Sequence, residues 1–325
     1  MKKLIFKVIF YNFFFILFFF IFLEFTLRIF NLSQIQGIKA ELYDDKMHRI
    51  KPNSEGIIGG KNFFVDDFGF RIPEKNYKYR DAKKIIILGD SVAFGNGVKE
   101  EKTFAGLLRK NLSNHEIYNL ALFGYQVEDY LVQLDEISKL YPIEKIVYFL
   151  TLNDVYERAK VKTVKYGENK YRKGFKRIFN HEFFRQVNVF FRDKSYLYTF
   201  LKGVIVDPQA SWFQNVLNYY NDHDLRLLKK FFLKFTELTK KQNIKSYVFI
   251  LPYEFQTRNC EINVLLPQTK IKKITDGINN NFYDLTAKFC NYKDPKKLYL
   301  KYDPMHLSEK GHNFVYSLTN DIINQ

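Results

Sequence analysis

A serine follows directly on a strongly apolar run in the stretch IIILGDSVAFGNG, which spans residues 85–97. Short β-branched runs that end in glycine are typical of buried parallel strands, so Ser91 is expected at the carboxyl end of a strand. A serine there acts as a nucleophile where the chain also supplies a base, and otherwise caps the next helix. Its role therefore depends on the partners that the rest of the chain supplies.

The loop after this strand lacks the patterns of the common phosphate-binding and nucleophile loops. It contains no G-x-G-x-x-G and no Gly-Lys-Ser/Thr, which excludes the dinucleotide and P-loop motifs. It also lacks the G-x-S-x-G of the usual nucleophile elbow. If Ser91 is a nucleophile, it lies on a different kind of turn.

A base and an orienting carboxylate occur together in YDPMHLSEKGH, near the carboxyl end of the chain. Asp303 and His306 lie three residues apart, close enough for the carboxylate and the imidazole to converge on one site. His306 is therefore the candidate general base and Asp303 its partner. The other histidines have no aspartate in such a setting and are expected in the core or at the surface: His48, His115, His181, His223 and His312.

Acyl transfer also requires hydrogen-bond donors directed at the developing oxyanion. Gly124, in the turn NLALFGYQ, offers a backbone N–H that no side chain obstructs, and Asn153, in TLND, offers a side-chain amide. Both residue types are also ordinary in loops. They become candidate donors only in combination with Ser91 and His306.

Strands and helices alternate around these candidates. Apolar runs at 84–88, 116–122, 145–151, 246–251 and 282–286 predict strands, and amphipathic patterns at 103–112, 127–140, 225–240 and 308–323 predict helices. The β-α-β-α-β order predicts right-handed crossovers and a parallel sheet. We expect an α/β fold, a three-layer α/β/α sandwich whose active face lies at the carboxyl ends of the strands.

In this order the residues resemble the SGNH hydrolase superfamily, also called the GDSL family. LGDSVAFG resembles its first block, Gly124 and Asn153 stand at the glycine and asparagine of its second and third blocks, and Asp303 and His306 fit its last block, Asp-x-x-His. The resemblance covers about residues 84–323 outside a middle insertion. It implies a flavodoxin-like SGNH domain that hydrolyses esters without a cofactor or metal. The implied triad is Ser91, His306 and Asp303, and the implied oxyanion donors are the N–H groups of Ser91 and Gly124 and the amide of Asn153.

Two positions depart from the family pattern. Thr151 stands where the third block commonly has a glycine, which bears on the turn that carries Asn153. Val92 stands where many members have leucine. The stretch VDDFGFR, at residues 65–71, is similar to a Gly-Phe-Arg stretch found ahead of the catalytic domain in some membrane-anchored members.

The first 30 residues, MKKLIFKVIFYNFFFILFFFIFLEFTLRIF, predict a membrane anchor. The apolar run and its flanks reach the ~20 residues that cross ~30 Å of hydrocarbon. A cleavable signal peptide is one alternative, although the segment after the run lacks a small-residue cleavage site, and a buried helix of a soluble protein is another. Lys2, Lys3 and Lys7 favour a single-pass topology with a cytoplasmic amino terminus, which puts the rest of the chain in the periplasm or outside the cell.

Residues 31–80 carry mixed charge and several turn signals, so we expect a connecting region with little regular structure ahead of a hydrolase-like domain at 81–325. The formal net charge is +16, and 13 basic against 3 acidic residues lie at 158–202. This segment belongs to a basic and aromatic insertion at about 158–222 that suits a polyanionic glycan, a lipid headgroup or single-stranded nucleic acid. The expected compartment disfavours nucleic acid. Small helices with buried aromatic faces are the structural alternative.

Cys260 and Cys290 are the two cysteines of the chain, and their spacing does not match a zinc site. They form a disulfide if their Cα atoms approach closely enough in an oxidising compartment, and otherwise remain thiols. The sequence leaves both alternatives open.

Together these features predict a membrane-anchored serine esterase of the cell envelope that removes O-acyl groups, with O-acetyl as the expected case, from a glycan or lipid-linked glycan. An O-acyltransferase with the same triad is the first alternative, and it implies an acyl-donor partner in the membrane. A non-catalytic glycan-binding protein is the second, favoured by Thr151 alone. The sequence does not fix the acyl chain length or the oligomeric state.

Overall fold

A nine-stranded sheet forms the centre of the computed structural model, which describes residues 2–30, 32–44, 49–155, 182–278 and 281–325. The strands follow the order β1-β4-β5-β6-β8-β7-β9-β10-β11 across the sheet. Two further strands, β2 (Leu42–Asp44) and β3 (Arg49–Ile50), form a separate antiparallel pair. The bounds in the large sheet are β1 Ile38–Lys39, β4 Glu55–Ile58, β5 Lys61–Val65, β6 Arg71–Ile72, β7 Lys83–Gly89, β8 His115–Asn119, β9 Ile143–Leu150, β10 Lys245–Ile250 and β11 Asn281–Asp284.

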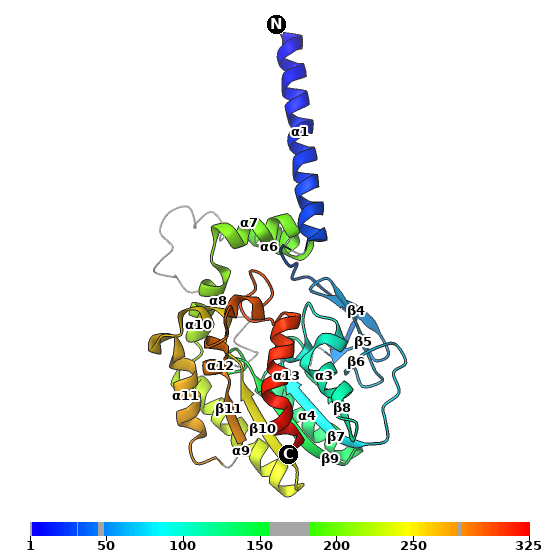
Figure 1. Ribbon diagram of the computed structural model, residues 1–325, viewed down its shortest axis with the longest axis vertical. Helices are drawn as coiled ribbons and strands as arrows, with labels where there is room; N and C mark the ends of the chain where they lie inside the picture. Colours follow the sequence, from blue (N-terminus) through cyan, green and yellow to red (C-terminus); the bar gives the residue numbers. More distant parts are fainter. Residues whose placement is uncertain (1, 31, 45–48, 156–181, 279–280) are drawn as a thin grey trace.

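Five neighbouring strands, β8-β7-β9-β10-β11, run parallel, and helices cover both faces of this part of the sheet (Figure 1). The expected three-layer α/β/α fold with a parallel sheet is confirmed. One face carries α3 (Phe104–Asn111) and α13 (Glu309–Asn324), and the other carries α4 (Val127–Leu140), α9 (Asp222–Lys241) and α11 (Leu266–Thr275).

The local sequence accounts for these elements. The core residues of β7, from Ile85 to Leu88, are fully buried, as expected for a strand covered on both faces. The hydroxyl of Thr103 accepts a hydrogen bond from the N–H of Gly106 at 3.1 Å and starts α3. Ser308 caps α13 in the same way. The helices predicted at 103–112 and 308–323 are therefore present and begin at these capping residues.

The connections of the parallel strands separate at the end of β7. The chain leaves β7 toward the face that carries α3, whereas it leaves the neighbouring strand β8 toward α4 on the opposite face. Loops that part in this way leave a crevice at the carboxyl ends of the strands. Ser91 follows β7 and lies at this point.

The expectation of little regular structure at residues 31–80 is wrong. β4 and β5 form a hairpin across the two-residue turn Gly59-Gly60, where both glycines have positive φ, as such a turn requires. β6 then pairs with β8 through Arg71 and Asn119 and joins the hairpin to the parallel strands. The turn signals in this region therefore mark a hairpin. The strands of this region have only two to five residues, which is too few for a clear alternating pattern of apolar and polar residues.

Arg71, at the start of β6, is fully buried and holds the loop after Ser91. Its guanidinium donates to the carbonyl oxygens of Phe94 and Gly95 and, at 2.7 Å, to that of Val98. Burial lowers the pKa of Arg71 to about 10, while the nearby charge of Glu100 acts in the opposite direction. The three carbonyl contacts replace the water that the guanidinium loses on burial.

The remaining helices are short or belong to the predicted insertion. Residues 158–181 of the insertion lie outside the described part, and its described part is helical. The short elements are α2 (Ser91–Phe94), α10 (Glu254–Asn259), α12 (Thr286–Cys290) and the 3₁₀ turns η1 (Glu100–Lys102), η3 (Ile262–Leu265) and η4 (Pro295–Leu298). The insertion contains α6 (Glu182–Lys194), α7 (Tyr196–Ile205) and α8 (Pro208–Leu217).

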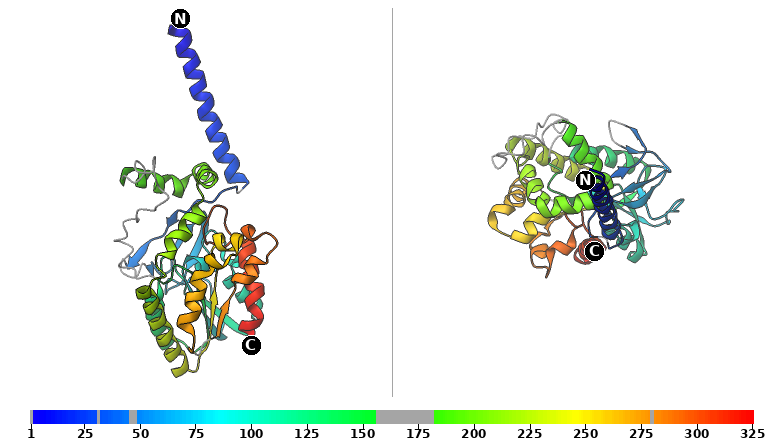
Figure 2. Two further views of the ribbon diagram at one scale, coloured as in Figure 1. Left: turned by 90° about the vertical axis from the view of Figure 1, so that its left-hand side faces the viewer. Right: turned by 90° about the horizontal axis from the view of Figure 1, so that it is seen from above.

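The amino-terminal helix α1 (Lys2–Ile29) projects from the α/β body, and its apolar stretch is not covered by other parts of the chain (Figure 1). Among the described residues it is the one helix long and apolar enough to cross a membrane, with a mean hydropathy of 2.4 over its most apolar window. α6 and α7 lie at its foot, across its axis, between α1 and the sheet (Figures 1 and 2).

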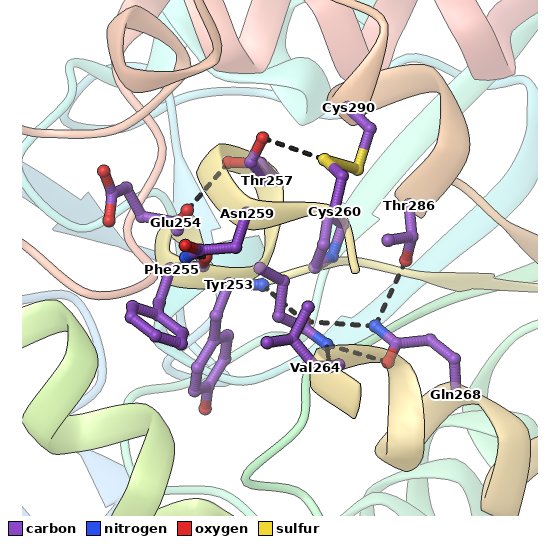
Figure 3. The surroundings of a disulfide bond; sticks show 12 residues. Tyr253, Glu254, Phe255, Thr257, Asn259, Cys260, Val264, Gln268, Thr286 and Cys290 are labelled. Carbon is purple, nitrogen blue, oxygen red and sulfur yellow. Dashed lines mark hydrogen bonds between the residues drawn. A yellow bond between two sulfur atoms is a disulfide. The ribbon is translucent and has the colours of Figure 1, made fainter. Parts of the chain in front are cut away.

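A disulfide joins Cys260 to Cys290, with their Cα atoms 6.0 Å apart (Figure 3). Of the two alternatives that the sequence left open, the structure has the disulfide. It ties the end of α10 to the end of α12. Gln268, on α11, bridges the same two helices, because its side-chain amide donates to Gln256 Oε1 of α10 and to the hydroxyl of Thr286 of α12, both at 3.1 Å.

We predict that Arg71→Met lowers the free energy of unfolding by about 3 kcal/mol or more, since three buried carbonyl oxygens lose a charged donor. Arg226→Met is the matched control, because Arg226 is exposed on α9. Its effect should stay within about 0.5 kcal/mol. Chemical denaturation of both variants measures the difference, and equal stabilities would show that Arg71 does not hold this loop.

Candidate active site

Ser91 is the first residue of α2 and lies directly after β7, as expected. Asp90 caps this helix, because its Oδ1 accepts a hydrogen bond from the N–H of Val92 at 2.9 Å. Gly89 allows the sharp turn between strand and helix. It has φ +152°, and a Cβ there would lie 2.5 Å from the Cβ of Ala93. The residue before Asp90 must therefore be glycine for α2 to pack against the strand end.

The structure brings Ser91, His306 and Asp303 into one hydrogen-bonded chain. The Oγ of Ser91 lies 2.8 Å from His306 Nε2, and His306 Nδ1 lies 2.8 Å from Asp303 Oδ2. The second carboxylate oxygen of Asp303 accepts from the N–H groups of Met305 and His306. These contacts favour the tautomer with a proton on Nδ1, which leaves Nε2 free to accept the proton of the serine.

The electrostatics of the pair support this arrangement. Burial opposes the charged form of Asp303, but the charge of His306 and the hydrogen bonds to the carboxylate outweigh it and lower the pKa of Asp303. Burial also opposes the charged form of His306 and so lowers its pKa. The carboxylate of Asp303, together with that of Asp90, outweighs burial and raises the pKa of His306 above its ordinary value. The site therefore stabilises an imidazolium at His306.

Asn153 lies beside the triad in a fixed orientation. Its Nδ2 donates to Asp90 Oδ2 at 3.0 Å. Its Oδ1 accepts from the hydroxyl of Thr151 at 3.0 Å and from that of Tyr253 at 2.6 Å. Two donors on the oxygen fix which way the amide faces. One of the two hydrogens on Nδ2 is used by Asp90, which leaves the other for a ligand.

The turn that carries Asn153 is formed without the glycine of the family pattern. Thr151 is not among the described residues with positive φ. Its N–H donates to Asp154 Oδ2 at 3.0 Å, and its carbonyl accepts from the N–H of Asp154 at 3.1 Å. The departure at Thr151 therefore leaves the turn intact and adds a hydroxyl that orients Asn153.

Gly124 lies in the loop between β8 and α4, with φ +79°. The N–H of Leu122 donates to the carbonyl of Gly89 at 3.2 Å, so this loop runs beside the turn that carries Ser91. A Cβ at Gly124 would meet no atom within 4 Å. The backbone at Gly124 therefore borders open space next to the serine turn, and its role as an oxyanion donor stays a prediction.

Two residues at the site are not singled out by the sequence. Asn96 Nδ2 lies 3.2 Å from His306 Nε2, and Tyr253 bonds to Asn153. Tyr253 follows β10 and Asn96 lies in the loop after α2, so both occupy the edge where the parallel strands end. The sequence carries one signal for both residues, since each lies in a loop after a predicted parallel strand.

Of the other histidines, His312 and His115 lie away from the triad chain. His312 is fully buried, accepts from the N–H of Phe104 at 3.3 Å, and has its pKa lowered to about 3, chiefly by burial. His115 is buried beside Glu144. His48 and His181 lie outside the described residues. Within the described ranges, no group of three or more His, Cys, Asp or Glu side chains is placed to hold a metal ion.

No protein-family model and no curated protein sequence matches the chain. Several solved structures are similar to it at low identity. One is an acetyl xylan esterase, AlAXEase, with 16% identity and a TM-score of 0.44 over 74% of this chain and 99% of that chain. A lipolytic G-D-S-L family protein from Veillonella parvula DSM 2008 has 13% identity and a TM-score of 0.44 over 75% and 100%. A catalytic mutant of an acetylxylan esterase from Geobacillus stearothermophilus has 15% identity and a TM-score of 0.42 over 74% and 94%.

We predict that the pKa of His306 lies above 6.5 in the unchanged protein and falls in Asp303→Asn, because the substitution removes the negative charge that favours the imidazolium. NMR titration of the histidine ring protons measures both values, with the His306 signal assigned through His306→Gln. The other histidine signals serve as internal controls. An unchanged pKa in Asp303→Asn would show that the carboxylate does not govern the charge of the ring.

Proposed function

We propose that the chain is a serine esterase of the SGNH hydrolase type, held at a membrane of the cell envelope, that removes O-acyl groups from a glycan or lipid-linked glycan. One observation carries the proposal. The hydrogen-bonded chain from Ser91 through His306 to Asp303 stands at the carboxyl ends of the parallel strands, and the amide of Asn153 donates to Asp90, next to Ser91. A helix-capping role for Ser91 does not explain these hydrogen bonds, since Asp90 already caps α2.

In the proposed reaction, Ser91 Oγ attacks the acyl carbon while His306 Nε2 accepts its proton. The resulting tetrahedral intermediate collapses when His306 returns the proton to the leaving alkoxide, which leaves the acyl group on Ser91. A water molecule then attacks the acyl carbon, with His306 again acting as base, and releases the carboxylic acid. Asp303 holds the ring and stabilises the imidazolium in both halves.

The oxyanion of the intermediate needs donors that are already in place. The unused hydrogen on Asn153 Nδ2 and the N–H groups of Ser91 and Gly124 are the proposed donors. Thr151 and Tyr253 act as positioning residues, because they hold the oxygen of Asn153 and so direct its nitrogen. Donors that are already oriented stabilise the negative charge of the intermediate strongly, because they do not have to reorganise during the reaction.

The membrane and compartment assignments rest on three features. α1 has the length and apolarity of a membrane span. Lys2, Lys3 and Lys7 favour a cytoplasmic amino terminus, which puts the sheet on the periplasmic or outer side. The Cys260–Cys290 disulfide fits an oxidising compartment.

The glycan part of the proposal is supported by the family resemblance and by the basic composition of residues 158–202. Lys173, Lys176 and Arg177, the basic cluster at the centre of that segment, lie outside the described residues. The same features, together with the outward topology, favour acetyl or another O-acyl group as the proposed substrate ester.

The first test is hydrolysis of a short activated ester by the full chain in detergent, beside its Ser91→Ala variant. We expect turnover in the unchanged protein and almost none in the variant, because the alcohol oxygen is the attacking atom. Thermal unfolding shows whether both are folded. Equal rates in two folded proteins would reject hydrolysis at Ser91 and favour a transferase that needs its own acyl donor, or a glycan-binding protein.

A second test separates the oxyanion donor from the residues that position it. Asn153→Ala should lower kcat ~10²–10³-fold. Tyr253→Phe should lower kcat by up to about tenfold, with KM unchanged, since it removes one hydrogen bond on the oxygen of Asn153. Tyr299→Phe is the matched control, because the hydroxyl of Tyr299 donates to the carbonyl of Pro252 and does not contact Asn153. A larger loss in the control than in Tyr253→Phe would reject the positioning role.

A further inference from the structure

Two helices at the foot of α1, α6 and α7, expose several apolar side chains. On α7 three of them are spaced i, i+3 and i+4, which puts them on one face of the helix. Ile205 is 80% exposed and Val204 62%, high values for side chains of this kind. The exposed apolar residues of the two helices and the turn after α7 are Val189, Phe190, Phe191, Leu201, Val204, Ile205 and Val206.

The opposite face of α7 is packed against the catalytic domain. A Cβ at Gly203 would lie 2.1 Å from the ring of Tyr302, so the helix backbone lies directly on that ring. Phe200 adds an edge contact with the same ring at 5.9 Å between centroids. Thr199 is buried beside Ser33. The domain therefore holds one face of α7 and leaves the apolar face outward.

Polar contacts fix α7 to the end of α1. The carboxylate of Glu24 accepts from the N–H groups of Tyr196 and Leu197 at 3.0 and 2.8 Å, at the amino terminus of α7. The guanidinium of Arg28 donates to the carbonyl of Lys194 at 2.7 Å, at the end of α6. A carboxylate is favourable at a helix amino terminus because it meets unpaired N–H groups.

These contacts set the height of α6 and α7 relative to the apolar stretch of α1. Glu24 is the first charged residue after the apolar run at 8–23, so it marks the boundary between hydrocarbon and headgroups if α1 spans a membrane. The α6–α7 junction bonds to this residue. Both helices run across the axis of α1 (Figures 1 and 2), which is the direction of a bilayer surface.

Basic side chains accompany the apolar ones. Arg192 and Lys194 end α6, and the ammonium of Lys194 lies 4.1 Å from the centroid of the Phe190 ring. Lys301, in the loop before Asp303, lies over the Phe200 ring. Helices that combine apolar and basic side chains in this way lie in the interface of bilayers that contain anionic lipids.

We propose that α6 and α7 form a second membrane contact, a platform that lies in the headgroup region. Its apolar face, turned toward the hydrocarbon, consists of Val189, Phe190, Phe191, Leu201, Val204, Ile205 and Val206. The proposal rests on the membrane anchoring in the proposed function, and it does not depend on the esterase activity. The occupant is a lipid surface, because the platform continues the apolar helix α1 and carries positive charge.

The platform has a consequence for the site. Tyr302, on which α7 rests, directly precedes Asp303. A bilayer that holds α7 therefore also holds the loop that carries Asp303 and His306. This places the catalytic centre close to the membrane surface at a fixed height.

The test uses nitroxide labels on the full chain in vesicles of phosphatidylcholine and phosphatidylglycerol. Leu201→Cys and Ile205→Cys report on the platform, and Phe18→Cys on α1. Leu233→Cys is the matched control, an equally apolar and exposed position on α9. Because Cys260 and Cys290 are paired, the label attaches to the introduced thiol. EPR saturation with oxygen and with a water-soluble nickel complex measures whether each label lies in lipid or in water.

We expect the ratio of oxygen to nickel accessibility at 201 and 205 to be several-fold higher than at 233 and below that at 18. Water-like values at 201 and 205 with a lipid-like value at 18 would overturn the platform and leave the anchor standing. A water-like value at 18 would overturn the anchor and the platform together. Low accessibility to both reagents at 205 would mean that a protein covers the face, and it would also overturn the lipid contact.

Discussion

The site depends on the position of α2, a helix of four residues that cannot be stable alone. Its start is fixed by Asp90, and the carbonyl oxygens at its end are held by the buried guanidinium of Arg71. Burying a guanidinium is unfavourable, and its lowered pKa reflects this cost. The contact also joins the hairpin ahead of the parallel strands to the turn that carries Ser91. The antiparallel strands are therefore part of the structure that positions the serine.

A second set of contacts connects the ends of three parallel strands. Asp90 follows β7, Asn153 follows β9 and Tyr253 follows β10, and hydrogen bonds join them in that order. Asp154 closes the turn from inside, where Tyr130 and Tyr148 donate to its carboxyl group. Burial and then the charge of Asp90 raise the pKa of Asp154 well above its ordinary value, and the hydrogen bonds oppose this shift. The amide of Asn153 is thus held by Asp90 on its nitrogen and by Thr151 and Tyr253 on its oxygen.

The sequence predicts the parts of this structure that long, regular patterns carry. The sequence predicts α4 with its observed bounds, because residues 127–140 form a clear amphipathic run. The sequence also predicts the triad, because a serine after a buried strand, followed later in the chain by Asp-x-x-His, is specific as an ordered combination. Arg71 and Thr151 were not assigned their roles, because strands of two to five residues show no period and a threonine in a loop gives no sign of what its hydroxyl contacts. Such contacts are set by tertiary packing, which spacing along the chain does not encode.

The direction of the parallel sheet decides which end of the domain faces α1. The loop that holds Asp303 touches α7, and α7 is bonded to the end of α1, so the carboxyl ends of the strands lie on the side of the anchor. The linker after α1 continues this contact, since Gln34 approaches Gly97, next to Asn96 and the triad. A sheet with the opposite orientation would direct the same triad away from the anchor. Ligands of parallel sheets bind at the carboxyl ends of the strands, so an anchor at this end would place the proposed reaction near the membrane.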